Sequence, residues 1–465
     1  MSPRHRRALG LLPLVAILFF NVSGGPYGLE DAVSSLGPGL ALLLLLVTPV
    51  VWSLPVALVM AELAAALPEE GGYVVWVRRA FGGFWGFQAG WWSWINSFVD
   101  VAVYPALFAD YLAFWRPGMS PLERWGLALA FIWILTAVNL AGVRITGWTA
   151  VVMGVVALAP AVALTVAAGS RLEEIPWRPF AADEGSLLAN LGLGLAIMMW
   201  NYSGWDTPTT VLGETRAPGA SFRRATWMTL PLITLAYVLP VVTGLSAAGD
   251  WQAWDTGHWP VVALAVGGPG LAHAVTLGAV VATAGLFLSL LLTNSRLPYA
   301  LALDGQMPAA LARLHPRFGT PWAAVVLSSV CYSLCAFWSF RELIVLNIWL
   351  YSIALLLELA AFVALRVREP HLPRPWRLRG SRGAMWLVAG LPALCCLLAM
   401  ATAGWANTGV GVLAALTGPL AYWLWRSPAA ARAPARALAR AWLTSAPETT
   451  RAAAGLARPT PPHHL

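Results

Sequence analysis

The sequence predicts an all-α membrane protein with twelve transmembrane helices. The chain has 465 residues, of which 59% are hydrophobic and only 11% are charged, and its mean hydropathy is +0.68. Apolar runs of about 20 residues, the length that crosses a bilayer as a helix, recur along the chain between short polar loops. A soluble protein of this size needs far more polar surface, so the composition excludes a soluble globular fold.

The apolar runs give the positions of the twelve spans, with boundaries that are soft by several residues. The first and the sixth span are broken by glycine. The spans lie at about 9–36, 39–66, 82–113, 124–142, 148–169, 187–213, 225–248, 269–300, 321–339, 342–366, 385–404 and 408–426.

Arginine placement orients these spans, because cytoplasmic loops of membrane proteins are enriched in basic residues. All 29 basic residues are arginine, and with both termini in the cytoplasm all but five of them fall on the inner side. The net charge of +8 therefore reflects topology, and we expect no nucleic-acid partner. Usage rich in arginine, alanine and tryptophan indicates a bacterial source, so we expect the inner (plasma) membrane. The five outer arginines are Arg116, Arg124, Arg171, Arg178 and Arg341.

The same pattern divides the chain into parts with different roles. We expect a cytoplasmic N-terminus, a ten-helix core, a basic cytoplasmic loop, two peripheral transmembrane helices and a cytoplasmic tail. The tail is rich in alanine, arginine and proline, which predicts a largely disordered segment. The corresponding ranges are 1–8, 9–366, 367–384, 385–426 and 427–465.

Two spans contain interruptions that are unusual for a membrane helix. In the first span, Gly24-Gly25-Pro26 separates an apolar run from a second segment that carries two acids. In the sixth span, the apolar half ends near Trp200 and is followed by Asn201–Gly204. A new half-helix is expected at Asp206-Thr207-Pro208, because Asp, Thr and Pro are favoured at helix starts.

These breaks predict a binding site. Backbone groups without helical partners cost several kcal/mol in lipid, so a break must line a wet or ligand-filled cavity. Corresponding broken helices in two halves of a chain point to the substrate site of a transporter. The breaks are five spans apart, so spans 1–5 and 6–10 would form an inverted repeat. Close helix packing at the glycines, or a simple kink, is the alternative.

The remaining chemistry argues against an enzyme. Cys331, Cys335, Cys395 and Cys396 lie in apolar segments without histidine at metal-binding spacing, and we interpret them as small buried hydrophobes. The sequence has no metal-spaced cluster, nucleophile motif or phosphate loop. We therefore expect no metal, no cofactor and no catalytic residue. A signalling membrane protein that does not transport is the remaining alternative.

Several stretches then identify a family resemblance. Residues 50–82, 201–225 and 293–311 resemble span 2, span 6 and the exit of span 8 in the amino acid–polyamine–organocation (APC) superfamily. Three further stretches, SGGPYGLEDAV (23–33), SFVDVAVYPALFADYL (97–112) and LLLELAAFVALRVREPHLPRPWR (355–377), are similar to the polyamine uptake transporters, with the L-type amino acid transporters as neighbours. The resemblance implies a LeuT-like 5+5 inverted repeat, alternating access, and substrate bound between spans 1, 3, 6, 8 and 10.

By this resemblance, the first break supplies backbone contacts to the substrate. Ser23, Gly24, Gly25 and Pro26 would form the unwound segment, where glycine permits close approach of a ligand to the backbone. Free N–H groups from Gly24 to Tyr27 would suit the carboxylate of an amino acid.

Two acids follow this break. Glu30 and Asp31 are adjacent in a helix and point about 100° apart, so we expect only one of them to face the cavity. They either stabilise the start of the half-helix or form an anionic wall for a cationic substrate.

Further acids lie in spans 3, 6 and 10. An ionisable group such as Asp100 inside a span indicates a functional site, with a structural hydrogen bond as the alternative, and Tyr104 lies one turn later. Asp206 would either cap the second half of span 6 or bind an amine. Glu358 matches an acid of the polyamine branch and is a candidate for cation binding or proton carriage.

The resemblance also assigns the segment before Asp206. Trp200 would be the aromatic gate over the substrate and could hold an ammonium group by cation–π attraction. The other residues of this segment are Asn201, Tyr202, Ser203, Gly204 and Trp205.

Together these features predict a secondary transporter of a small molecule. Buried acids favour a polyamine, whereas the free N–H groups suit an amino acid, so both substrates stay open. The chain has no lysine in span 5 or elsewhere, which argues against a span-5 lysine in place of sodium. We expect a proton as coupling ion, carried by a buried carboxylate, with exchange as an alternative.

Overall fold

The computed structural model describes residues 8–171, 173–182, 187–247, 250–338 and 340–425. The predicted cytoplasmic N-terminus (1–8, except its last residue) and the predicted tail (427–465) lie outside these ranges. The described residues form α-helices with short 3₁₀ and π turns, and they contain no β-strand; Leu9 and Thr215 form one isolated β-bridge. The all-helical prediction is confirmed for this part of the chain.

The first half of the chain forms ten α-helices and two further helical segments. Predicted span 2 is one apolar rod with a π-helical middle, and predicted span 3 is divided between two helices. The elements are α1 (Leu11–Val22), α2 (Glu30–Leu36), α3 (Pro38–Thr48), η2 (Pro49–Ser53), α4 (Leu54–Ala66), α5 (Tyr73–Phe81), α6 (Gly83–Asp100), α7 (Val103–Leu112), α8 (Pro121–Leu140), α9 (Val143–Gly169), α10 (Leu187–Asn201) and η3 (Thr207–Glu214).

The second half contains the longest helix of the described chain. It starts about ten residues before predicted span 8 and bends at Gly268, where φ is +73°. The elements are α11 (Pro218–Ala247), η4 (Trp251–Ala253), α12 (Trp259–Asn294), α13 (Arg296–Leu303), η5 (Ala309–Ala312), α14 (Trp322–Cys335), α15 (Phe340–Arg368), α16 (Arg382–Thr402) and α17 (Trp405–Trp425).

Eight helical segments of the described chain are long and apolar enough to cross a membrane. The other four predicted spans fall short for a physical reason: three are divided into two helical pieces, and α14 has only 14 residues. Twelve spans therefore stay a prediction. The eight are Pro38–Ala66, Pro121–Leu140, Val143–Gly169, Pro218–Ala247, Trp259–Leu303, Trp349–Arg368, Arg382–Thr402 and Trp405–Trp425.

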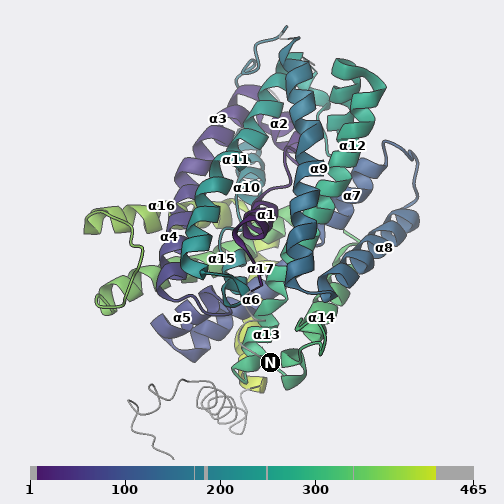
Figure 1. Cartoon of the computed structure of the whole chain (residues 1–465). Helices are drawn as coiled ribbons and strands as arrows, with labels where there is room; N and C mark the ends of the chain where they lie inside the picture. Colours follow the sequence, from purple (N-terminus) through teal and green to yellow (C-terminus); the bar gives the residue numbers. More distant parts are fainter. Residues whose placement is uncertain (1–7, 172, 183–186, 248–249, 339, 426–465) are drawn as a thin grey trace, which may run out of the picture.

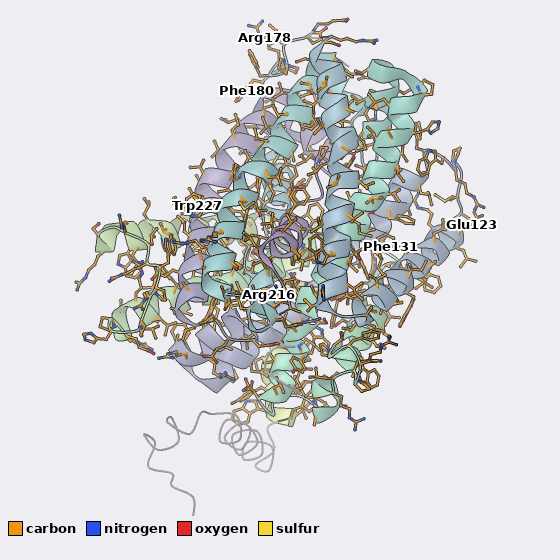
Figure 2. The ribbon with its side chains drawn as sticks, viewed as in Figure 1. Glu123, Phe131, Arg178, Phe180, Arg216 and Trp227 are labelled. Carbon is orange, nitrogen blue, oxygen red and sulfur yellow. The ribbon has the colours of Figure 1, made fainter. Side chains whose placement is uncertain are left out.

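The bundle surrounds the broken helices. Figure 1 shows α1 near the centre, and α1 packs against α9, α11 and α12. The other broken helix, α10, packs against α2, α3, α15 and α16. In Figure 2, Arg178 and Phe180 lie at one end of the bundle and Arg216 toward the other.

Both predicted breaks are present. Residues 23–29, between α1 and α2, are not helical, and Gly25 and Gly28 have φ of +96° and +91°. Residues 202–206 separate α10 from η3. The second half of span 6 was expected as an ordinary half-helix, but Thr207–Glu214 is a 3₁₀ helix.

Candidate functional site

A cavity lies where the two breaks meet. The segments between α1 and α2 and between α10 and η3 form part of its wall, and residues of α5, α6, α7, α11, α12 and α15 complete it. The lining residues are Asn21, Val22, Ser23, Gly24, Tyr27, Tyr73, Ser93, Asn96, Asp100, Tyr104, Trp200, Asn201, Ser203, Gly204, Asp206, Thr207, Tyr237, Leu286, Leu290, Asn294, Asn347, Tyr351 and Ala354.

The two breaks pack directly against each other at Gly204. This residue has φ of +96°, and a Cβ there would lie 2.1 Å from the carbonyl oxygen of Asn21. The sequence therefore needs glycine at this position for two reasons, the backbone conformation and the close approach of another backbone.

A single tyrosine on α11 ties the ends of the two broken helices together. The Tyr237 hydroxyl lies 2.7 Å from the carbonyl oxygen of Asn201 and 3.3 Å from that of Val22, the last residues of α10 and α1. Carbonyls at a helix end have no partner within the helix. Tyr237 therefore satisfies carbonyl oxygens that the breaks would otherwise leave without a donor.

Two carboxylates line the cavity, each with hydrogen-bond donors from α15. Asp100 Oδ1 accepts hydrogen bonds from Asn347 Nδ2 (2.7 Å) and Trp200 Nε1 (3.1 Å). Asp206 Oδ1 accepts one from the Tyr351 hydroxyl (2.6 Å), which also accepts the Gly204 N–H (3.2 Å). Both carboxylates are thus held in place by neutral donors.

The position of Asp206 argues against one of its two predicted roles, the helix cap. Its side chain makes no capping hydrogen bond to η3, so the capping interpretation is not met. The Thr207 hydroxyl also donates to this carboxylate, at 3.4 Å from Oδ2. Asp206 is 3% exposed and its side chain belongs to the cavity wall.

A third carboxylate lies on the same helix as the donors. Asn347, Tyr351, Ala354 and Glu358 are spaced 4, 3 and 4 residues apart, so they share one face of α15. Glu358 is 1% exposed, is not among the lining residues, and neither of its carboxylate oxygens has a hydrogen-bond partner among the described residues. A buried carboxylate without partners is costly.

Two neutral polar atoms of the lining are also without partners in the described part of the chain. They are the Tyr73 hydroxyl and the Asn96 Oδ1 atom. Buried polar groups normally have a hydrogen-bond partner, so these two atoms are available to a ligand or to water.

Aromatic side chains cover part of the cavity. The rings of Trp200 and Tyr104 stack with centroids 5.9 Å apart and an interplanar angle of 23°. Trp200 is 8% exposed and donates its Nε1–H to Asp100, so the carboxylate lies at the edge of the indole ring. Such a pair suits an ammonium group.

The first pair of predicted acids lies elsewhere. Glu30 accepts hydrogen bonds from the Tyr111 hydroxyl (2.5 Å), the Gly28 N–H (2.7 Å) and the Gly257 N–H (3.2 Å). Asp31 accepts one from Thr256. Neither lines the cavity, which corrects the expectation that one of them would face it. Their bonds hold the start of α2 and the segment before α12.

Four more predicted residues lie in the breaks but outside the lining. Pro26 uses its carbonyl to accept the Trp259 Nε1 hydrogen bond (2.9 Å), and Gly25 donates its N–H to Ser23 Oγ (3.1 Å). Tyr202 donates to the Leu45 carbonyl (2.9 Å), and Trp205 Nε1 donates to the Tyr202 carbonyl (2.9 Å). Tyr202 and Trp205 therefore brace the second break against its surroundings.

The sequence reasoning missed most of the donors around the carboxylates. Asn347 and Tyr351 precede Glu358 on one helix face, so helical spacing from that acid could have found them. Asn96 lies four residues before Asp100, so the same spacing from that acid could have found it, whereas Tyr73 and Tyr237 have no acid of the cavity within one helical turn in the sequence.

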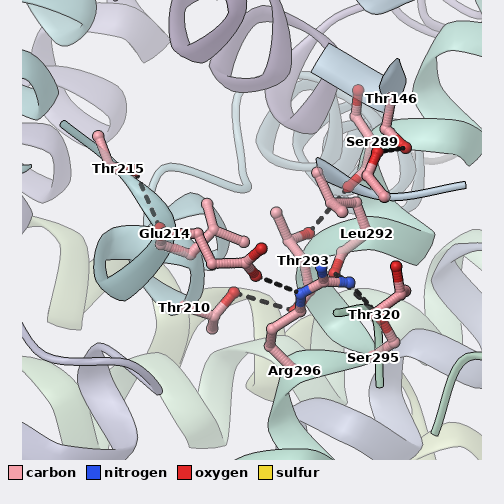
Figure 3. Close-up of polar contacts among 12 residues, drawn as sticks. Thr146, Thr210, Glu214, Thr215, Ser289, Leu292, Thr293, Ser295, Arg296 and Thr320 are labelled. Atoms are coloured by element: carbon pink, nitrogen blue, oxygen red, sulfur yellow. Dashed lines mark hydrogen bonds and ion pairs between the residues drawn. The ribbon is translucent and has the colours of Figure 1, made fainter. Parts of the chain in front are cut away.

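Buried ion pairs join elements next to the site. Arg296, which is 1% exposed, donates to Glu214 Oε1 at 2.9 Å and to the Leu292 carbonyl at 3.0 Å, which connects the end of η3 to the α12–α13 junction (Figure 3). Glu62, fully buried, pairs with Arg366 and lies 3.3 Å from Arg374. These contacts give Glu62 a structural role that joins α4 to α15 and the connection after it.

The cavity has a simple electrostatic character. Its lining contains two carboxylates and no arginine, lysine or histidine. Within the described residues, no group of three or more His, Cys, Asp or Glu side chains could hold a metal ion. The side chains of the cavity suit a positively charged solute, which carboxylates, hydroxyls and an indole can bind.

Comparison with known proteins gives a consistent result. The family model described as amino acid permease matches residues 9–424. A probable polyamine transporter of Arabidopsis thaliana is 35% identical over 393 residues, which cover 84% of this chain and 78% of the relative. A polyamine transporter of Oryza sativa subsp. japonica is 34% identical over 416 residues, covering 89% and 77%.

A more distant bacterial relative covers a similar share. An uncharacterized transporter of Mycobacterium bovis is 29% identical over 422 residues, which cover 88% of this chain and 90% of the relative. The family model spans almost all of the described residues. The chain therefore belongs to the amino acid permease family of the APC superfamily and is an integral membrane transporter.

Proposed function

We propose that this transporter imports polyamines, such as putrescine or spermidine, across the plasma membrane. The observation that carries the proposal is the charge of the cavity, where Asp100 and Asp206 have no basic counterpart among the lining residues. A polyamine has several ammonium groups and no carboxylate, so carboxylates in a low-dielectric cavity favour it over an anion. The names of the plant relatives support the same substrate class.

In this proposal one ammonium group binds between Asp100, Trp200 and Tyr104. The carboxylate and the indole ring would supply charge pairing and cation–π attraction. A second ammonium group binds at Asp206, and the hydrocarbon chain between them lies along Leu286 and Leu290 of α12. The unpartnered Tyr73 hydroxyl and Asn96 Oδ1 atom accept further hydrogen bonds from ammonium N–H groups or water.

We propose that transport uses alternating access in a twelve-helix, LeuT-like fold. Spans 1–5 and 6–10 would be inverted repeats, with both termini in the cytoplasm. The breaks at residues 23–29 and 202–206, five predicted spans apart and packed against each other, support this architecture.

We also propose coupling to protons, with Glu358 as the carrier. Its carboxylate is buried and lacks hydrogen-bond partners among the described residues, so binding a proton would relieve the cost of burying a charge there. It lies two helical turns from Tyr351, which binds Asp206. Exchange without a proton remains the competing scheme.

Competition uptake in proteoliposomes tests the substrate. Radiolabelled putrescine would be competed with spermidine, arginine, leucine and small neutral amino acids, with and without an inside-alkaline pH gradient. We expect spermidine to compete, leucine to be ineffective, and the gradient to stimulate uptake. Competition by leucine or by arginine instead would move the assignment to an amino acid transporter.

Two variants test the acids separately. Asp206→Asn removes one charge-assisted hydrogen bond to the substrate, worth about 1.5–3 kcal/mol, so the KM for putrescine should rise about 10–100-fold. Glu358→Gln should retain binding but lose stimulation by the pH gradient. Glu174→Gln, which changes an exposed acid outside the helices, is the matched control. Normal putrescine uptake by both Asp206→Asn and Glu358→Gln would contradict the proposal.

A further inference from the structure

A second hollow lies on the outside of the bundle, away from the central cavity. Three segments form it: the start of α1, the first turns of α11, and the connection between α15 and α16. Its lining residues are Leu11, Arg223, Arg224, Trp227, Met228 and Trp376.

The two arginines in this hollow have no partner of opposite charge. Arg223 is half-buried and Arg224 is exposed, and no hydrogen bond or ion pair joins either side chain to another described residue. Arginine is charged at any physiological pH, so this hollow carries two uncompensated positive charges. A guanidinium group is also well shaped for a phosphate.

The residue types that line the hollow are typical of a membrane interface. Trp227 and Met228 are 52% and 50% exposed, and Trp376 faces the same hollow from the α15–α16 connection. Figure 2 shows Trp227 on the outer surface of the bundle beside α11. Tryptophan is enriched at the level of lipid headgroups, and the arginine distribution predicts that this end of α11 faces the cytoplasmic leaflet.

An apolar track leads from the arginines into the predicted hydrocarbon region. Arg224, Met228, Leu232, Leu235 and Leu239 are spaced 4, 4, 3 and 4 residues apart, so they lie on one face of α11. The three leucines are 38%, 54% and 45% exposed. The track is about 22 Å long, which exceeds the roughly 15 Å depth of one leaflet's hydrocarbon.

We propose that this hollow binds an anionic phospholipid, with its phosphate between Arg223 and Arg224 and an acyl chain along the α11 track. Free phosphate would leave the apolar track uncovered. A zwitterionic lipid carries its own positive charge and would not compensate two arginines. A lipid with a net negative headgroup, such as phosphatidylglycerol or cardiolipin, matches both the charge and the apolar track.

Lipid retention by the purified full-length chain tests this proposal. Protein would be mixed with micelles containing equal amounts of phosphatidylcholine and phosphatidylglycerol, and retained lipid would be counted by native mass spectrometry. We expect selective retention of phosphatidylglycerol. Arg223→Gln/Arg224→Gln should weaken it about 30-fold, as expected from the loss of two interfacial charges.

Three comparisons separate the proposal from its alternatives. Arg223→Lys/Arg224→Lys keeps both charges and should retain the lipid. This variant is also the control for a folding defect caused by substitution at these two positions. Arg144→Gln/Arg313→Gln removes two exposed arginines elsewhere and should behave as wild type. Added inorganic phosphate should not displace the lipid at millimolar concentration. Equal retention of both lipids, or unchanged selectivity in Arg223→Gln/Arg224→Gln, would overturn the proposal.

Discussion

Gly204→Ala is the sharpest test of how the two breaks fit together. Its added methyl carbon would lie 2.1 Å from the Asn21 carbonyl oxygen and 3.0 Å from the Asn21 carbonyl carbon. Both are backbone atoms of the other broken helix, so no side-chain rotation relieves the contact. The backbone conformation itself, with φ of +96°, also disfavours alanine.

The magnitude follows from these two effects. A left-handed conformation costs a non-glycine residue about 1–2 kcal/mol, and overpacking a filled site costs about 1–3 kcal/mol. The sum is about 2–5 kcal/mol, and the breaks must separate by roughly 1 Å to relieve the contact. Because both breaks line the cavity, we expect uptake to fall at least about 30-fold.

The assay combines uptake in proteoliposomes with thermal unfolding followed by tryptophan fluorescence. Gly126→Ala is the matched control, since this helical glycine in α8 has nothing within 4 Å of an added Cβ. It should leave uptake unchanged and stabilise the helix by about 0.5–1 kcal/mol. If Gly204→Ala melts and transports like the control, the packing of the two breaks at this glycine is not what supports the cavity.

Three further outcomes follow from the contacts. Tyr351→Phe removes a hydroxyl from the cavity and should raise the KM for putrescine about 3–10-fold in uptake assays, through loss of about 1 kcal/mol. Arg296→Gln breaks the ion pair with Glu214, whose side chain is 18% exposed and can be hydrated, and should destabilise the protein by about 1.5–3 kcal/mol in thermal unfolding, whereas removing both charges should cost less. Hydrogen bonds from Arg79 hold the pKa of Glu369 below its usual value. At a pH above the usual glutamate pKa, this ion pair therefore stabilises the fold, and the stabilisation is lost as the pH falls through the lowered pKa. Glu369→Gln should reduce the fall in melting temperature between pH 6 and pH 3.

The breaks were predictable because their cause is local. Glycine pairs and a proline remove helical preference within a few residues, so Gly24-Gly25-Pro26 and Ser203-Gly204 identified both interruptions from the sequence. Asp100 and Asp206 were also predicted for the cavity, and both line it. An acid inside a span needs a polar surrounding wherever the span lies.

The direction of the first two acids was not predictable in the same way. The phase of α2 is set by the backbone path through residues 23–29, and the sequence does not define that path. Two of the three partners of Glu30 are Tyr111 and Gly257, which lie 81 and 227 residues away. Tertiary contacts of this range turn Glu30 from the cavity into a structural hydrogen-bond network.

The sequence prediction of the second half of span 6 was limited in a similar way. Asp206, Thr207 and Pro208 correctly marked where a helical segment restarts, but not its type. The segment forms a 3₁₀ helix of eight residues, which is long for this helix type. The Tyr351 hydroxyl, from a helix 145 residues further along, binds the carboxylate that would otherwise cap it.

The Tyr237 hydroxyl has a consequence for motion. Because one side chain on α11 bridges the terminal carbonyls of α1 and α10, we expect these three helices to shift together during the transport cycle. Cavity closure would then depend on how the remaining walls approach this unit. In an empty cavity the negative charges of Asp100 and Asp206 repel each other, whereas a dication neutralises both. The charges that we propose select the solute would thereby also determine when the protein closes around it.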